Sequence, residues 1–180
     1  MANCARSYVW HSHATEPMNS VLINPNGNPV SYLPVVADSG NIYAGLLVDQ
    51  TGTTYLNEVT EMGAQQGKDH LDKSPLLVEI NSDHMNLPLN WDKTTAYPDG
   101  AKLKALELFV GMDVWCKGST LTTLQDETLV PAAAGLVDNM TDPDGEVIEQ
   151  VAWGFRALAP MTSGTWIPCR YLGRVTFDDS

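Results

Sequence analysis

The chain has 180 residues, 43% hydrophobic and 18% charged, a balance typical of one globular domain, or two small ones, and not of a disordered, collagen-like or coiled-coil chain. Ten Lys and Arg against 22 Asp and Glu give a formal net charge of −12, which disfavours nucleic acid and anionic membranes as partners. No apolar run approaches the roughly 20 residues of a membrane span. The first residues lack the plan of a secretory signal, so we expect a soluble, unprocessed protein.

Turn-forming residues divide the chain into short segments. Its 11 Pro and 14 Gly recur at intervals of about 8–12 residues, the spacing expected of an all-β fold. The Asn-Gly pair within 24–30 predicts a hairpin or a tight turn. Residues 41–59 predict two strands joined by a turn at Gly52, and 61–75 predict a surface loop or a short helix.

The middle of the chain also favours strands. Residues 76–80 form a short apolar segment that predicts a strand. Residues 81–100 predict a polar connection in which two prolines forbid a long helix, and we expect Trp91 and Tyr97 to pin it to the core.

Two periodicities compete within 101–110, where apolar residues recur at helical spacing and also alternate as in a strand. We expect strands at 106–110 and 113–118, with Gly111 as a turn or bulge between them. Strands are favoured because a helix here would end almost as soon as it was nucleated. The alternative is one short helix at 101–107.

The last third of the chain predicts a turn at 142–145, a strand within 145–158 and a β-rich end at 165–180. No alternation of strands and helices is visible, which excludes Rossmann-like and TIM-barrel enzymes. The fold class expected is all-β, with at most one short helix. We expect an N-terminal arm over 1–20 and a β-rich domain over 21–180, with a subdivision near 90–100 as an alternative.

The three cysteines, Cys4, Cys116 and Cys169, are odd in number and form no CxxC or CxxH spacing. This usage fits reduced thiols in cytoplasm, with a Cys116–Cys169 disulfide as the alternative. Cys116 lies between Trp115 and Lys117, and we expect it to be a small core or interface residue, although the adjacent lysine would lower its thiol pKa.

Alternating histidines, His11 and His13, would point the same way on a strand and could share a metal. Two ligands do not make a site, and the residues that could complete it are His70, His84, Asp69, Asp72 and Asp83. Together with Glu16, the two histidines resemble the metal-binding motif of cupins only weakly. They also lie at the extreme N-terminus, so a pair at the surface or at an interface is favoured over a metal site.

An acidic segment at 142–149 offers Asp142, Asp144 and Glu149 as oxygen ligands for calcium. Its spacing does not match the EF-hand pattern, and Pro143 favours a solvated tight turn.

Catalytic and nucleotide motifs are missing from the sequence, which contains no GxSxG, GxGxxG or GxxxxGK. The five Trp residues favour core and interface positions over sugar stacking. We therefore predict no catalytic, cofactor-binding or metal-binding residue.

From about residue 100 the order of strands and glycines forms a pattern. It runs from a strand with Gly111 to a turn at 117–118, a Leu-Val-Pro segment at 129–131, an Ala-Trp-Gly strand at 152–154 and a Ser-Gly turn at 163–164. This order resembles the small β-rich decoration, or cement, proteins that coat the capsids of tailed bacteriophages. The resemblance covers roughly the C-terminal half, with 41–49 as an earlier copy of the motif, and rests on strand and Gly order.

The resemblance implies a compact β-barrel or β-tulip, assembled as a homotrimer and bound to the major capsid protein on the outer capsid surface. There it would bridge capsomers and stabilise the head, after assembly in the host cytoplasm, with no cofactor and no catalytic residue. The acidic charge of the chain is compatible with a protein displayed at high copy number on a particle.

Aromatic residues are the expected contacts of such a protein. Tyr8, Val9 and Trp10 in the arm could lie on the capsid as an added strand, and a frayed terminus or a first barrel strand is the alternative. With Trp153 and Trp166 they form the predicted interface set, because aromatic anchors dominate interfaces. The competing functions are another virion part, such as a head fibre or tail component, and a cupin-type metal enzyme.

Overall fold

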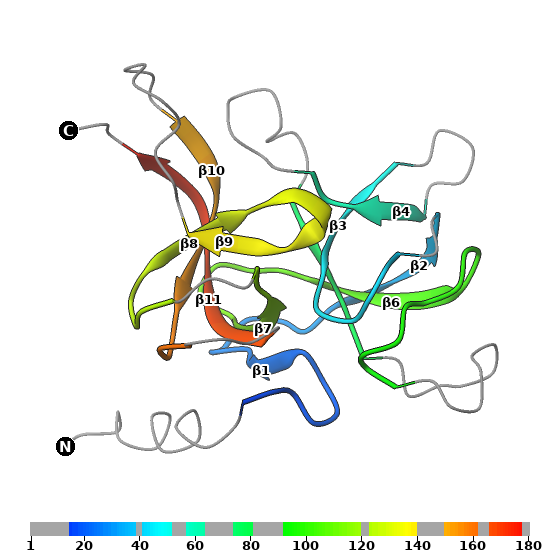
Figure 1. The fold of residues 1–180 in the computed structure, drawn as a ribbon, viewed down its shortest axis with the longest axis horizontal. Coiled ribbons are helices and arrows are strands. Elements are labelled where there is room, and N and C mark those ends of the chain that lie inside the picture. The colour runs from blue at the N-terminus through cyan, green and yellow to red at the C-terminus, as the bar shows by residue number, and fades with distance from the viewer. Residues whose placement is uncertain are drawn as a thin grey trace.

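The computed structural model describes residues 15–38, 41–51, 57–63, 74–80, 92–119, 123–139, 150–161 and 166–177. Within these ranges the regular structure is strands and one short 3-10 turn, so the all-β prediction is confirmed (Figure 1). The elements are β1 (Leu22–Asn24), β2 (Tyr32–Ala37), β3 (Leu47–Gln50), β4 (Glu58–Glu61), β5 (Leu76–Val78), β6 (Lys102–Glu107), β7 (Asp113–Lys117), β8 (Thr128–Pro131), η2 (Ala133–Gly135), β9 (Val137–Asn139), β10 (Gln150–Ala157) and β11 (Trp166–Phe177).

The strands β2 to β6 close into a barrel in the order β2-β4-β3-β5-β6. All neighbours are antiparallel except β2 and β4, which run parallel. Alternation explains the barrel interior: on β6 the lysines Lys102 and Lys104 are exposed, whereas Leu103 and Ala105 are buried. Closure leaves these strands without a free edge.

The remaining strands form a six-stranded sheet in the order β1-β7-β11-β10-β8-β9, beside the barrel in Figure 1. Its longest strand, β11, pairs with β7 over Trp166–Arg170 and with β10 over Cys169–Phe177. The register between β10 and β11 shifts between Gly154 and Phe155, where Gly154 lies opposite Gly173.

One hydrophobic core joins barrel and sheet, because barrel residues such as Leu47 and Leu77 belong to the same buried cluster as Trp115 and Phe155 of the sheet. The two parts approach closely at Gly45, which has a φ of +82° and whose α-carbon lies against the ring of Trp166. A side chain at Gly45 would occupy the space of that ring, so glycine is required there.

Local turn predictions compare well with the structure. Asn26 and Gly27 have φ values of 50° and 86°, and the Asn28 amide donates to the Pro25 carbonyl at 3.0 Å, as in a type I′ turn. The flanking strands β1 and β2 lie in different sheets, so this is a tight turn and not a hairpin. The strand pair predicted within 41–59 is present as the antiparallel neighbours β3 and β4, but β3 begins only at Leu47 and β4 extends beyond the predicted range to Glu61. The turn predicted at Gly52 lies outside the described residues.

The alternative of a short helix at 101–107 is wrong, because this segment is strand β6. The strand expected at 106–110 begins earlier, at Lys102, and ends at Glu107, because alternating burial against the barrel interior begins at Leu103. Gly111 is a turn residue as predicted, with a φ of +94°, and the Met112 amide donates to the Phe109 carbonyl at 3.0 Å.

The other predicted strands are present as β5, β7, β10 and β11. Tyr97 is fully buried and its hydroxyl donates to the Glu79 carbonyl at 2.8 Å, which confirms it as an anchor of the 92–100 connection. Trp91, most of the loop expected at 61–75 and the turn expected at 142–145 lie outside the described residues.

The described part of the predicted arm, residues 15–20, is attached to the barrel side of the molecule. Lys93 donates to the Pro17 carbonyl at 2.7 Å and pairs with Glu16 at 2.7 Å. The buried carboxylate of Glu79 accepts from the Ser20 hydroxyl at 2.8 Å and from the Val21 amide at 2.7 Å. These contacts fix the entry into β1.

Candidate functional site

The predicted interface residues fall into two groups. Tyr8, Val9 and Trp10 lie outside the described residues. Trp153 and Trp166 are buried within the chain itself, with exposed fractions of 6% and 3%. Their part in an interface between chains stays a prediction.

Trp153 stands on β10 over the second half of β11. Its ring lies 6.3 Å from the ring of Tyr171, centroid to centroid, and the guanidinium of Arg174 lies 5.4 Å from its centroid. The indole Nε1 is buried and makes no hydrogen bond within the described part of the chain.

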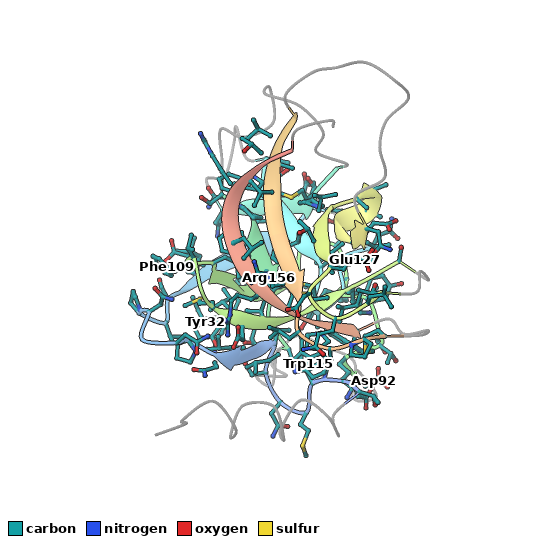
Figure 2. All side chains as sticks on the ribbon, turned by 90° about the vertical axis from the view of Figure 1, so that its left-hand side faces the viewer. Tyr32, Asp92, Phe109, Trp115, Glu127 and Arg156 are labelled. Atoms are coloured by element: carbon teal, nitrogen blue, oxygen red, sulfur yellow. The ribbon has the colours of Figure 1, made fainter. Side chains whose placement is uncertain are left out.

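A group of exposed apolar side chains gathers where the loop after β1 meets the turn after β6. We call this group, Val30, Tyr32, Phe109 and Val110, the apolar corner; the exposed fractions are 46%, 38%, 36% and 64%. Figure 2 shows Tyr32 and Phe109 on the same edge of the molecule.

Hydrogen bonds between the two segments create the apolar corner. The side-chain amide of Asn28 donates to the Val110 carbonyl at 3.0 Å, and that of Asn26 donates to the Gly111 carbonyl at 2.7 Å. The Glu107 amide donates to the Ser31 carbonyl at 3.0 Å. This surface was not predicted, because Phe109 and Val110 were expected in a strand at 106–110, whereas β6 ends at Glu107 and the turn predicted at Gly111 already begins at Phe109.

A cavity of about 620 Å³ lies at the junction of barrel and sheet. Its lining comes from both parts and consists of Asn41, Tyr43, Leu46, Glu61, Lys117, Gly118, Ser119, Ala134 and Leu136. The residues approach closely because Gly135, with a φ of +70°, brings its backbone against the Leu47 carbonyl.

Lys117 is the cation of this cavity. Its ammonium lies 4.7 Å from the ring centroid of Tyr43 and 5.3 Å from that of Trp166, and its backbone amide donates to the Gly45 carbonyl at 2.8 Å. Burial lowers the pKa of Lys117 below its ordinary value, because the charged form loses hydration. Cation–π attraction to the two rings compensates part of the lost hydration free energy of the ammonium.

Both described cysteines, Cys116 and Cys169, are buried free thiols, so the alternative of a disulfide between them is not what the structure shows. Burial, and then the neighbouring Cys116 thiol, raise the pKa of Cys169 well above its ordinary value. Such thiols are unreactive core residues, as expected for Cys116.

Within the described ranges no group of three or more His, Cys, Asp or Glu is placed to hold a metal ion. All four histidines and the acidic segment 142–149 fall outside those ranges. No helix of the described part is long and apolar enough to cross a bilayer.

Similarity to known proteins is found in the structure and not in the sequence. No family model and no curated protein matches the sequence. Among solved structures, the chain is similar to the N base of the head fiber protein gp8.5 of bacteriophage phi29, with 9% sequence identity and a TM-score of 0.50. The match covers 83% of this chain and 99% of that one. At this identity the likeness establishes a shared all-β fold.

Proposed function

We propose that the chain is a structural protein of a bacteriophage virion, and that it serves as the base of a head fibre. The observation that carries the proposal is the fold shared with a head fiber base, because the match extends over 99% of that chain and 83% of this one. The resemblance of the C-terminal half to capsid decoration proteins points to the same class of particle surface.

The fibre-base role is preferred to the cement role because the structural neighbour is a fiber part. A decoration protein that bridges capsomers is the alternative within the same class, and both roles place the chain on the outer capsid surface. The major capsid protein and further copies of this chain, assembled as a homotrimer, are the proposed partners. A purely structural role requires no catalytic group and no cofactor.

The apolar corner is the proposed contact surface for a further copy of the chain. Phe109 and Val110 project from a turn, and an exposed apolar group of this kind is the usual centre of a protein interface. The formal net charge of −12 of the chain would oppose association through other surfaces, because like charges repel.

The first experiment locates the chain on particles. Immunogold labelling of purified virions should place it on the head, at fibre attachment points for a fibre base and over the whole shell for a cement protein. Absence of the chain from purified particles would overturn the proposal.

The second experiment measures the oligomeric state by light scattering. The wild-type chain should be a trimer, and Val110→Asp should be a folded monomer. Leu124→Asp is the matched control, because Leu124 is as exposed as Val110, at 66% against 64%. Leu124 lies away from the apolar corner: its backbone amide donates to the side chain of Glu127, and Figure 2 shows Glu127 on the side of the molecule opposite Phe109. Equal association of the two variants would remove the apolar corner from the interface.

A further inference from the structure

We propose that the cavity between barrel and sheet is a binding site for a monocarboxylate with an apolar body, held through Lys117. This inference is independent of the proposed function, because it rests on the chemistry of the cavity lining. The shared chemistry is a carboxylate attached to a short hydrocarbon, which an aliphatic acid and the acidic side chain of a peptide both supply.

Lys117 provides the charge recognition. Within the described part of the chain no carboxylate lies within ion-pair distance of its ammonium, which is half-buried beside two aromatic rings. Ring faces compensate a buried cation only in part, so an anion entering the cavity would gain a charge-assisted hydrogen bond. The backbone bond from Lys117 to Gly45 holds the strand end, and therefore the start of this side chain, in place.

The rest of the lining fits a hydrocarbon. Leu46, Ala134 and Leu136 face the cavity together with the ring of Tyr43. A volume of about 620 Å³ lies within the range of roughly 300–1,000 Å³ found for small-ligand sites. Burial of an apolar chain here would add the non-directional part of the binding free energy.

One further charge restricts the ligand. Glu61 also lines the cavity, and its negative charge opposes any anion, a dianion such as phosphate more strongly than a monocarboxylate. Sugar stacking is disfavoured as well, because Lys117 already occupies a face of Tyr43 and of Trp166. A monoanion remains the best fit.

The test is a titration of the full chain with sodium hexanoate, followed by amide chemical shifts in two-dimensional NMR. Hexanoate should saturate shifts at Lys117, Gly118 and Ser119. Hexylamine, of the same length and opposite charge, and inorganic phosphate should not. A short peptide with one Glu between two Leu, capped at both ends, distinguishes the sources: tighter binding than hexanoate assigns the site to a polypeptide side chain, and weaker binding assigns it to a small acid.

Variants identify the residues responsible. Lys117→Met should weaken hexanoate binding at least about 10-fold, because a charge-assisted hydrogen bond is lost. Lys102→Met is the matched control, an exposed lysine of β6 outside the cavity lining, and should bind as the wild type does. Leu136→Trp keeps Lys117 and fills the cavity, so it should also abolish binding. Unchanged binding by either Lys117→Met or Leu136→Trp, or equal binding of hexylamine and hexanoate, would overturn the proposal.

Discussion

Arg170 on β11 holds the buried carboxylate of Asp113 on β7 through two hydrogen bonds, from Nε to Oδ1 at 2.8 Å and from the terminal nitrogen to Oδ2 at 3.1 Å. The two residues are direct cross-strand partners. The side chain of Asp113 is 2% exposed and that of Arg170 is 42% exposed, so the carboxylate is buried whereas the guanidinium is partly solvated.

Removal of the arginine should leave a buried, unpaired carboxylate. We predict that Arg170→Met lowers the free energy of unfolding by about 2–4 kcal/mol, less than the usual cost for a fully buried pair because the guanidinium is partly solvated. Urea denaturation measures the loss. The double variant Asp113→Leu with Arg170→Met should regain most of it; if the two single losses simply add, the pair does not act as a unit.

A side chain at Gly45 should clash at the junction of barrel and sheet. Gly45→Ala should destabilise the protein by about 3 kcal/mol, since the new methyl group meets the ring of Trp166 and the φ of +82° is also unfavourable. Gly27→Ala is the matched control, because its φ of +86° is similar and nothing lies within 4 Å of the added carbon. It should lose about 1–2 kcal/mol. Thermal and urea unfolding compare the two, and equal losses would contradict the predicted contact.

Loss of the Glu79 carboxylate should open the chain locally before β1. Its carboxylate accepts from Ser20, Val21 and Ile80 at 2.7–2.8 Å, so Glu79→Ala should leave buried donors unsatisfied and cost about 2–3 kcal/mol. Hydrogen exchange at the Val21 amide should accelerate most. The Leu158 amide, bonded to Pro168 in the sheet, serves as the internal reference. Equal acceleration at both amides would indicate global unfolding and not local release.

Ionisation of the buried Tyr171 phenol should lower the stability of the protein at alkaline pH. Burial raises the pKa of its phenol above the ordinary value of about 10, and the nearby Arg174 lowers it only in part. The folded pKa exceeds the unfolded one, so the contribution is complete below pH of about 10 and is lost as the pH rises toward the folded pKa.

Tyr171→Phe tests this dependence. Between pH 9 and 11.5 the wild type should lose about 1 kcal/mol or more of unfolding free energy beyond the loss of the variant. The difference between the two proteins measured at pH 7 is the reference. Parallel curves across this range would show that another group is responsible.

Local signals accounted for most of the elements that could be predicted. The Asn26-Gly27 turn, the segment that became β5 and the long terminal strand β11 were predictable, because turn chemistry and short apolar runs act over a few residues. The error near 101–110 arose because Leu106 and Leu108 suggested a later strand, whereas Lys102 to Ala105 already alternate.

The sites could not be predicted in the same way. The apolar corner exists because the loop after β1 bonds to the turn after β6, and the cavity exists because Tyr43 and Lys117 meet across the junction of barrel and sheet. Both depend on contacts between residues more than 70 positions apart, for which periodicity carries no signal.

The pairing of β1 with β7 has a consequence for the order of folding. All five barrel strands lie between these two partners in the sequence, so β1 has no sheet to join until the barrel segment has been made and β7 follows it. Closing so long a loop before its contacts form is entropically unfavourable and slows folding. During synthesis from the N-terminus the barrel should therefore assemble first, and β1 should stay unpaired until β7 has been made.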